Sequence, residues 1–402
     1  MTFGRLRIIG IACGCAIVWL AGCGGGGSQK SAVNNTAPLV VNAGPTNNYA
    51  NGLFTTVTIC ASGTSTCQDV SGVLVDTMSY GVRILSSALN ASVSGALTQE
   101  KDASGNSVAE CAQFSDGITW GPVKTADIKI AGEQASGLPI QVIGDPAFSA
   151  VPVGCTSAGS PEDTLTSLGA NGILGIGPFV QDCPACAPET TNNQNFYYAC
   201  AGSSCNVTTV ALPQQVQNPV AAFSVDNNGV LVELPAVSSS AISLNGSLIF
   251  GIGTEKNNSL GSAQVFTIST KPSDAGNIST TFKGQTYSSF LDTGSNAYFF
   301  LDSATSGLPT CPSPANGFYC PSSLTNLSAT NTGSNNASGS VSFSIDNADT
   351  LFSNAADSVF PTLGGPNSGT FDWGLPFFYG RNVFVAIEGG QTPGGAGPYW
   401  AY

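Results

Sequence analysis

Residues 289–300 have the sequence SFLDTGSNAYFF. The apolar pair Phe290 and Leu291 leads into Asp292, which is followed by a hydroxyl residue, a glycine and a second hydroxyl residue. Three aromatic residues close the stretch at 298–300. This pattern predicts a buried β-strand that ends in a tight, hydrogen-bonded loop, and the loop presents one carboxylate.

A similar stretch, GVLVDTMSYG, occupies residues 72–81. Both stretches contain two apolar residues, then Asp-Thr, any residue, and Ser. Two copies of one pattern indicate an internal duplication that brings two carboxylates, those of Asp76 and Asp292, to one place. The two aspartates are 216 residues apart (292 − 76), which leaves room for a complete lobe between them.

The paired motifs resemble those of the pepsin-like aspartic peptidases. The resemblance implies an all-β, bilobal pepsin-like acid protease fold, with a central cleft between two related β-rich lobes. Each lobe of that family gives one Asp-Thr-Gly-Ser/Thr loop to the cleft, so Asp76 and Asp292 would be the catalytic pair. Less specific similarities at residues 171–177, 245–253 and 371–381 extend the resemblance over roughly residues 50 to 400. In the last of these, Asp372 stands where the family has an apolar residue.

The resemblance also assigns supporting roles around the two carboxylates. In the family, the threonines donate hydrogen bonds to the opposite loop's backbone, the following hydroxyls bond the outer carboxylate oxygens, and the glycine offers its N–H and leaves space. The corresponding residues here are Thr77, Ser79, Thr293, Gly294 and Ser295.

Met78 departs from the family pattern, because it stands where the first motif has a glycine. If the loop needs a positive φ or close packing at this position, the Met78 side chain is costly. If φ is negative and the side chain points outward, the chemistry survives.

A hairpin within residues 113–132 resembles the family's flap, which closes over substrate. Phe114 falls where the family has a tyrosine, and Trp120 lies nearby in the sequence. We therefore expect Phe114 and Trp120 to be flap residues. An ordinary surface hairpin with an apolar tip is the alternative.

The composition narrows the possible chemistry. Only 9% of the 402 residues are charged, 49 are glycine and none is histidine. The abundance of glycine and of β-forming residues favours an all-β architecture with many turns. The lack of histidine excludes Ser-His and Cys-His catalysis and any His-ligated zinc site. We expect no cofactor and no metal in the catalytic site.

The N-terminal residues predict export. Residues 1–22 have a basic start and an apolar run, and Leu20 to Cys23 match a bacterial lipobox, which predicts a lipoprotein signal peptide and lipidation at Cys23. A plain secretory signal cut near Ala21 or Gly22 is the alternative. By resemblance to such lipoproteins, Gly24 after the cysteine favours the outer membrane. The sequence thus predicts a bacterial envelope protein held at the membrane only by an N-terminal lipid anchor.

Further boundaries follow from composition. We expect a flexible tether at residues 23–37, an N-terminal lobe at 38–228 and a C-terminal lobe at 229–402. Without Arg5 and Arg7 the chain has 9 basic and 24 acidic residues, a net charge of −15. This acidity disfavours nucleic acid as a partner, and we expect a monomer with a polypeptide substrate or ligand in its cleft. Residues 321–340, rich in Ser, Asn, Thr and Gly, are expected to form a loop or insertion.

Ten cysteines follow Cys23, and an even number in an exported chain predicts disulfides. The spacing favours the pairs Cys60–Cys67, Cys111–Cys155 and Cys311–Cys320. Four others cannot be paired from the sequence, and a zinc site is their functional alternative. They are Cys183, Cys186, Cys200 and Cys205.

Three functions are therefore open. The first is an aspartic endopeptidase in which Asp76 and Asp292 activate water. The second is a catalytically inactive pepsin-like binding protein, which Met78 and Phe114 favour. The third is a structural envelope lipoprotein.

Overall fold

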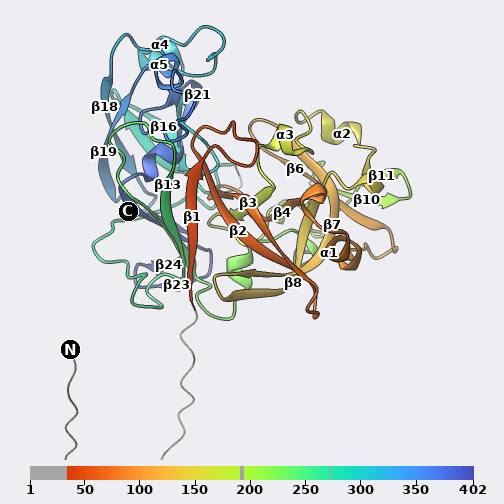
Figure 1. Ribbon diagram of the computed structural model, residues 1–402. Coiled ribbons are helices and arrows are strands. Elements are labelled where there is room, and N and C mark those ends of the chain that lie inside the picture. Colours follow the sequence, from red (N-terminus) through yellow and green to blue (C-terminus); the bar gives the residue numbers. More distant parts are fainter. Residues whose placement is uncertain (1–33, 191–193, 272) are drawn as a thin grey trace, which may run out of the picture. The chain divides into compact units, whose positions relative to one another are not determined.

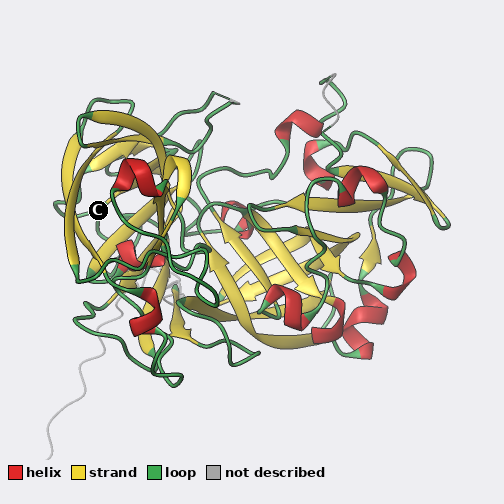
Figure 2. Cartoon of the chain, turned by 90° about the horizontal axis from the view of Figure 1, so that it is seen from above, coloured by secondary structure: helices red, strands yellow, loops and turns green. Residues whose placement is uncertain are grey.

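The computed structural model describes residues 34–190, 194–271 and 273–402, and these residues form an all-β fold in which helices are short (Figures 1 and 2). The predicted signal peptide and Cys23 lie outside the described residues. Among the residues described, no helix has the length and apolar character needed to cross a membrane.

A 16-stranded sheet contains most strands of the first half together with strands from the second half. Its main path runs β11-β10-β6-β7-β8-β4-β9-β3-β2-β1-β13-β12-β22-β25-β14, and β5 pairs with β7. The strands are β1 (Thr36–Asn42), β2 (Gly52–Ala61), β3 (Cys67–Asp76), β4 (Tyr80–Leu85), β5 (Thr98–Gln99), β6 (Ser107–Gln113), β7 (Ile118–Ile130), β8 (Glu133–Ile143), β9 (Gly172–Ile176), β10 (Tyr197–Ala201), β11 (Ser204–Val207), β12 (Gly229–Leu234), β13 (Leu244–Phe250), β14 (Val265–Thr267), β22 (Arg381–Ala386) and β25 (Tyr399–Ala401).

A seven-stranded sheet belongs entirely to the second half, in the order β19-β18-β15-β16-β21-β17-β20. Its strands are β15 (Ile278–Phe282), β16 (Gln285–Leu291), β17 (Tyr298–Leu301), β18 (Thr325–Thr332), β19 (Ser338–Ile345), β20 (Gly364–Gly365) and β21 (Asn367–Trp373), and β23 (Gln391–Thr392) pairs separately with β24 (Gly395–Ala396). The helices are α1 (Ala91–Ala96), α2 (Val153–Thr156), α3 (Leu165–Leu168), α4 (Ser303–Ser306) and α5 (Ala348–Leu351), with 3-10 turns η1 (Ser86–Ala88), η2 (Pro146–Phe148), η3 (Pro184–Cys186), η4 (Leu212–Gln214), η5 (Pro219–Ala222) and η6 (Leu375–Phe378).

Equivalent strands deliver the two aspartates. The antiparallel hairpin β2–β3 ends at Asp76, and β9 runs parallel beside β3. In the second half, the hairpin β15–β16 leads directly into Asp292, and β21 runs parallel beside β16. The repeated arrangement confirms the prediction of two related β-rich lobes.

Glycines at the ends of β9 and β21 allow this arrangement. A Cβ on Gly175 would lie 2.5 Å from the Tyr80 nitrogen, and a Cβ on Gly374 would lie 2.0 Å from the Ala297 oxygen. Only glycine lets the crossing strand approach the loop behind each aspartate so closely.

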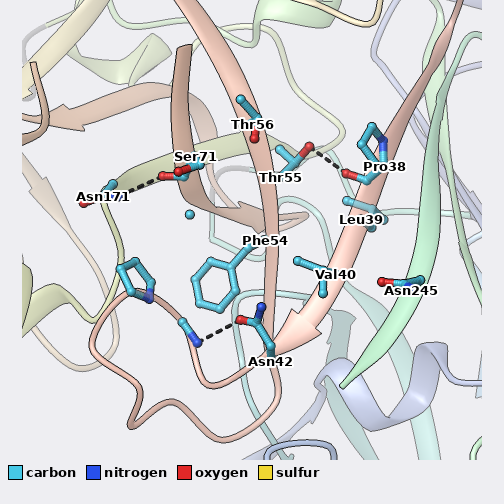
Figure 3. Close-up of a pocket in the computed structure, with 13 residues that line it drawn as sticks. Pro38, Leu39, Val40, Asn42, Phe54, Thr55, Thr56, Ser71, Asn171 and Asn245 are labelled. Carbon is cyan, nitrogen blue, oxygen red and sulfur yellow. Dashed lines mark hydrogen bonds between the residues drawn. The ribbon is translucent and has the colours of Figure 1, made fainter. Parts of the chain in front are cut away.

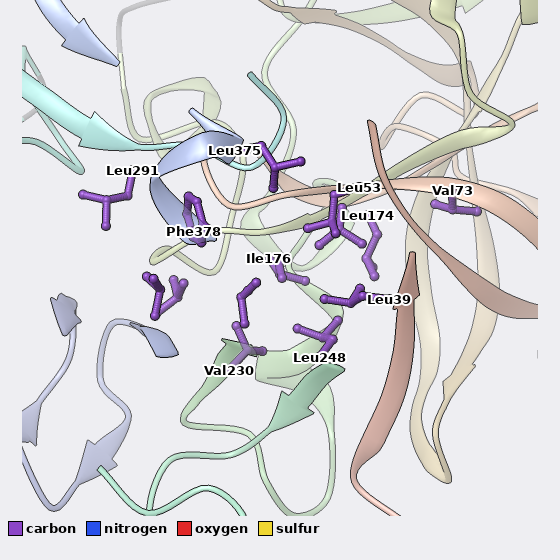
Figure 4. Close-up of a cluster of buried hydrophobic side chains, with 14 of the residues drawn as sticks. Leu39, Leu53, Val73, Leu174, Ile176, Val230, Leu248, Leu291, Leu375 and Phe378 are labelled. Carbon is purple, nitrogen blue, oxygen red and sulfur yellow. The ribbon is translucent and has the colours of Figure 1, made fainter. Parts of the chain in front are cut away.

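One hydrophobic core runs through both halves. Leu39 and Leu248 come from the paired strands β1 and β13, Val73 from β3 and Leu291 from β16, and all are fully or nearly fully buried (Figure 4). The motif strands therefore end at this core, which stabilises the positions of the loops that follow them. Strands β12 and β13 lie in the same sheet as β1, so no break between sheets marks residue 229. The lobe boundary predicted at that residue therefore stays a prediction.

All ten cysteines after Cys23 form disulfides. The three predicted pairs, Cys60–Cys67, Cys111–Cys155 and Cys311–Cys320, are confirmed. The remaining pairs are Cys183–Cys186 and Cys200–Cys205, which leaves none of these four cysteines as a thiolate for zinc.

Two boundary expectations differ from the structure. Strand β1 begins at Thr36, so the last two residues of the expected tether belong to the fold. The expected loop at residues 321–340 contains β18, which pairs along its whole length with β19. The prediction was wrong because a polar sequence does not by itself indicate a loop. Polar residues of β18 are buried where they find hydrogen-bond partners: Asn331 is buried and accepts a hydrogen bond from the Thr280 hydroxyl at 2.6 Å.

Candidate active site

Reciprocal hydrogen bonds between two threonines join the motif loops. The Thr77 hydroxyl donates to the Leu291 carbonyl oxygen (2.9 Å), and the Thr293 hydroxyl donates to the Val75 carbonyl oxygen (2.7 Å). Each hydroxyl also accepts the other threonine's N–H, at 3.0 Å for Thr77 and 3.2 Å for Thr293. Both threonines are fully buried, so these bonds are shielded from water. The role expected of Thr77 and Thr293 matches this geometry.

Each aspartate folds its own loop by accepting backbone N–H groups. Asp76 Oδ1 accepts from the Met78 N–H (2.7 Å) and the Ser79 N–H (3.1 Å). Asp292 Oδ1 accepts from the Gly294 N–H, also at 2.7 Å. Such turns need an aspartate followed by free N–H groups, whatever side chain the third residue carries.

Gly294 lies against the opposite aspartate. A Cβ on Gly294 would be 2.9 Å from Asp76 Cγ and 3.1 Å from both Asp76 Oδ1 and Asp292 Oδ1. The two carboxylate oxygens are therefore at most twice 3.1 Å apart. The structure brings Asp76 and Asp292 together, and Gly294 supplies the space that its predicted role requires.

Met78 fits the loop without a glycine-like backbone. It is absent from the described non-glycine residues with positive φ, so its backbone is not strained. Its side chain is half-buried, packs against the core cluster, and lies 3.4 Å from the position that a Cβ on Gly276 would take. The side chain thus points across to the loop before β15 while its N–H still holds Asp76.

The two serines of the motifs differ. Ser295 Oγ lies 2.9 Å from Asp292 Oδ2, as its expected role requires, and 2.5 Å from Asp372 Oδ2. Ser79 Oγ is buried and has no partner among the described residues. The expected hydroxyl bond from Ser79 to Asp76 is therefore wrong, and the Ser79 N–H makes the contact instead.

Burial raises the pKa of Asp292 well above its usual range, and the nearby charge of Asp76 adds to this effect. Burial also raises the pKa of Asp372 to about 8. Burial and the neighbouring charge therefore both favour the neutral form of Asp292.

A cavity of about 600 Å³ opens above the two aspartates and is lined by residues from both halves of the chain. Phe114, at the tip of the β6–β7 hairpin, lines this cavity together with Leu74, Ile173 and Phe290. Glu162 also lines it, and burial raises the pKa of this carboxyl to about 7. The cavity combines apolar walls with a few acidic groups, as ligand sites do.

Phe114 therefore lies where a flap residue would lie, but Trp120 does not. Trp120 is 1% exposed, donates its indole N–H to the Phe148 carbonyl oxygen (2.7 Å) and packs edge-on against Tyr198. Both faces of β7 are buried around this position, so Trp120 packs into the core instead of facing the cavity. The expectation that Trp120 is a flap residue is wrong.

A buried ionic network that sequence reasoning missed lies beneath the hairpin. The Arg83 guanidinium pairs with Glu110 of β6 and, at 2.9 Å, with Asp182, and it lies over the Phe114 ring at 5.8 Å. Burial lowers the pKa of Arg83, but the charges of Glu110 and Asp182 outweigh this effect and raise the pKa overall. The network connects the β6–β7 hairpin to β4, the strand that follows the Asp76 loop. The sequence gives no local signal for this pairing, because the residues are far apart along the chain.

A second cavity, of about 410 Å³, lies against β1 and β2 (Figure 3). Its lining includes Phe54 and no ionisable side chain. Two of its polar groups are already paired, since Asn42 accepts from the Gly44 N–H (2.8 Å) and Thr55 donates to the Pro38 oxygen (2.9 Å). It therefore offers no groups for acid–base chemistry.

Among the described residues, Cys311, Cys320 and Asp349 lie close enough together to hold a metal ion. The two cysteines are bonded to each other, which removes both thiolates as ligands. No metal site is assigned from this group.

Comparison with known proteins supports the fold and names a family. The crystal structure of aspartic proteinase from Irpex lacteus is similar to this chain, with a TM-score of 0.53 and 15% identity over 91% of this chain and 96% of that chain. At this identity the likeness shows the pepsin-like fold alone. No curated protein matches the chain. Residues 31–402 match the family described as "Protein of unknown function (DUF3443)", and the chain belongs to that family.

Proposed function

We propose that this protein is an aspartic endopeptidase that hydrolyses peptide bonds in unfolded or extended polypeptide. The observation that carries the proposal is the pairing of Asp76 and Asp292, whose loops are joined by the Thr77 and Thr293 hydrogen bonds beneath the cavity. The likeness to an aspartic proteinase structure supports the same function by analogy.

The chemistry needs one proton on the pair. The ionised carboxyl takes a proton from a water molecule as that water attacks the peptide carbonyl carbon. The protonated carboxyl gives its proton to the carbonyl oxygen, so the two residues exchange roles in one step. The carboxyl that gained the water proton then passes it to the leaving amine as the peptide C–N bond breaks, and the other carboxylate takes a hydroxyl proton from the tetrahedral intermediate, which restores one proton on the pair. Hydrolysis proceeds while the pair keeps its shared proton, so activity is favoured by acid.

Cleavage of a denatured polypeptide at several acid pH values tests this function. We expect Asp76→Asn and Asp292→Asn each to lower kcat/KM by about 10²–10⁴-fold, because each removes one partner of the acid–base pair. Asp349→Asn is the matched control, since Asp349 is exposed and does not line the cavity. An unchanged rate in either dyad variant would contradict the proposal.

A binding protein without turnover is the second candidate. Phe114 favours it, because its ring offers no hydroxyl at the tip of the β6–β7 hairpin. This candidate predicts that a pepstatin-type inhibitor binds the cavity while no polypeptide is cleaved at any pH. Binding of neither inhibitor nor polypeptide would leave the structural envelope protein as the remaining function.

We also propose that the protein acts at the bacterial cell envelope, anchored through a lipid on Cys23 in the outer membrane. The lipobox sequence at residues 20–23 supports this location. Fractionation of cells tests it: Cys23→Ser should move the protein from the membrane fraction to the soluble fraction. Retention of the variant in the membrane would contradict the lipid anchor.

A further inference from the structure

We propose that Asp372 is a third carboxyl of this site, which exchanges a proton with Asp292 through the Ser295 hydroxyl. In this way it keeps the Asp76/Asp292 pair singly protonated to a higher pH than two carboxyls alone would. The inference rests on the proposed function, and it adds a positioning and proton-holding residue to it.

The Ser295 hydroxyl bridges two carboxyl groups but has only one hydrogen. Its oxygen is 2.9 Å from Asp292 Oδ2 and 2.5 Å from Asp372 Oδ2. If both carboxyls were ionised, one of these contacts would set lone pair against lone pair. One carboxyl must therefore donate to Ser295, and the 2.5 Å contact has the length of a charge-assisted O–H···O bond.

Asp372 is built to hold such a proton. It is 6% exposed, and its Oδ1 is buried without a hydrogen-bond partner among the described residues. An ionised carboxylate in that position would leave its charge uncompensated, whereas the neutral acid costs far less. In agreement, burial raises the pKa of Asp372 to about 8.

The two halves of the molecule differ at this position. Asp372 pairs with Phe290, which lies two residues before Asp292. The counterpart of Asp372 in the first half is Ile173 of β9. Its neighbours on that strand, Gly172 and Leu174, pair with Val73 and Val75. An apolar residue is thus sufficient for the strand crossing, and the carboxyl of Asp372 serves another purpose.

The ionisable groups that lie around Asp372 come from three strands. Asp292 follows β16 on one side, and Asp76 comes from β3 across the cavity. On the other side, β17 places Tyr298 against Trp373, and burial raises the pKa of this tyrosine to about 12, so it stays neutral. The electrostatics at Asp372 are therefore those of three neighbouring carboxyls.

The proton exchange conserves atoms and charge. Asp372 gives its proton to Ser295 Oγ while the Ser295 proton passes to Asp292 Oδ2, so Asp372 becomes the carboxylate and Asp292 the acid. No oxidant or co-reactant is involved. When rising pH removes one proton from the group of three, the remaining proton can still reside on the pair, and hydrolysis continues.

The pH dependence of cleavage by Asp372→Asn tests the inference. An asparagine amide can still donate to Ser295 but cannot titrate, so the variant keeps this contact and removes the exchangeable proton. The upper limb of the profile should move down by about one pH unit or more. Superimposable profiles would overturn the inference.

Glu133→Gln is the matched control for loss of a buried carboxyl. Glu133 is 2% exposed and outside the cavity, and burial raises its pKa to about 7. Its variant should leave the upper limb where it is. A shift equal to that of Asp372→Asn would show a general stability effect and overturn the inference.

A double-variant cycle separates exchange through Ser295 from a direct charge effect. In a Ser295→Ala background, Asp372→Asn should add no further shift of the upper limb. An equal shift in both backgrounds would contradict transfer through the serine.

An infrared measurement on the resting protein separates failure of this inference from failure of the proposed function. At pH 7 the wild type should retain a carboxylic-acid C=O absorption that Asp372→Asn lacks. Loss of that band, even in a protein that cleaves nothing, would support a proton held at Asp372. Identical spectra would overturn the inference even if the protein is an active peptidase.

Discussion

The loops of Asp76 and Asp292 are two copies of one turn that differ in the third residue and in how the fourth residue, a serine in both, is bonded. Met78 and Gly294 donate the same N–H bond at the same 2.7 Å. Ser295 bonds its aspartate through the hydroxyl, whereas Ser79 uses only its N–H. The comparison shows that the aspartate's acceptor oxygens define the turn. A glycine is required only at position 294, because the Asp76 carboxylate of the opposite loop lies close to it.

Exchanging the third residues gives the largest expected effect. In Gly294→Ala the new Cβ would lie 2.9 Å from Asp76 Cγ, so the Asp76 carboxylate must move. We expect a loss in kcat/KM of about 100-fold or more, because misplacement of a catalytic group by about 1 Å costs that much. Met78→Gly should cost much less, since the Met78 N–H that bonds Asp76 is retained and only the side chain that lines the cavity is lost. Equal effects of the two variants would show that the loops are not asymmetric.

The threonine hydrogen bonds should give the next effect, and it should be equal in both loops. Thr77→Val leaves the Leu291 carbonyl and the Thr293 N–H buried without partners. We expect the free energy of unfolding, measured by denaturant titration, to fall by about 2–4 kcal/mol for Thr77→Val and Thr293→Val alike. Thr77→Ser, which retains the hydroxyl, should recover most of the loss. A large difference between the two valine variants would contradict equivalent roles.

The third prediction concerns pH and the contrast between Asp372 and Ile173. Burial raises the pKa of Asp372 from 3.8 to about 8, so between these values the folded protein binds more protons than the unfolded chain. Stability therefore falls as pH rises through this window, and Asp372→Asn escapes that loss. Relative to the wild type, the variant should gain up to about 1.4 kcal/mol per pH unit in thermal or denaturant unfolding. A difference in stability that does not depend on pH would contradict the raised pKa.

The smallest effect is expected at Ser79. Its hydroxyl is buried without a partner among the described residues, so Ser79→Ala should change the free energy of unfolding by less than about 0.5 kcal/mol. The same variant should leave cleavage nearly unchanged. Ser295→Ala should lower the upper pH limit of cleavage, because Ser295 contacts two carboxyls. A larger effect from Ser79→Ala than from Ser295→Ala would reverse the assignment of the two serines.

Local patterns predicted much of the fold and the centre of the site. The paired motifs located Asp76 and Asp292 at strand ends, and short cysteine spacings predicted pairs such as Cys60–Cys67.

Residues whose surroundings come from distant strands could not be predicted in this way. Trp120 resembled a flap residue because it follows the hairpin tip, but it packs on Tyr198, far along the chain. Strand β18 has a polar sequence and is held by cross-strand pairs with β19. Asp372 gave a usable signal, since it lies between Phe371 and Trp373 where the family pattern has an apolar residue, but its contact with Ser295 required the fold.

The central claim is that Asp76 and Asp292 face each other closely enough to share a proton. Carbon-13 NMR titration of the aspartate carboxyls in the wild type and in Asp76→Asn tests it most directly. Because the charge of Asp76 contributes to the raised pKa of Asp292, we predict that Asp76→Asn lowers the pKa of Asp292. An Asp292 titration that is unchanged by removal of the Asp76 charge would contradict the account.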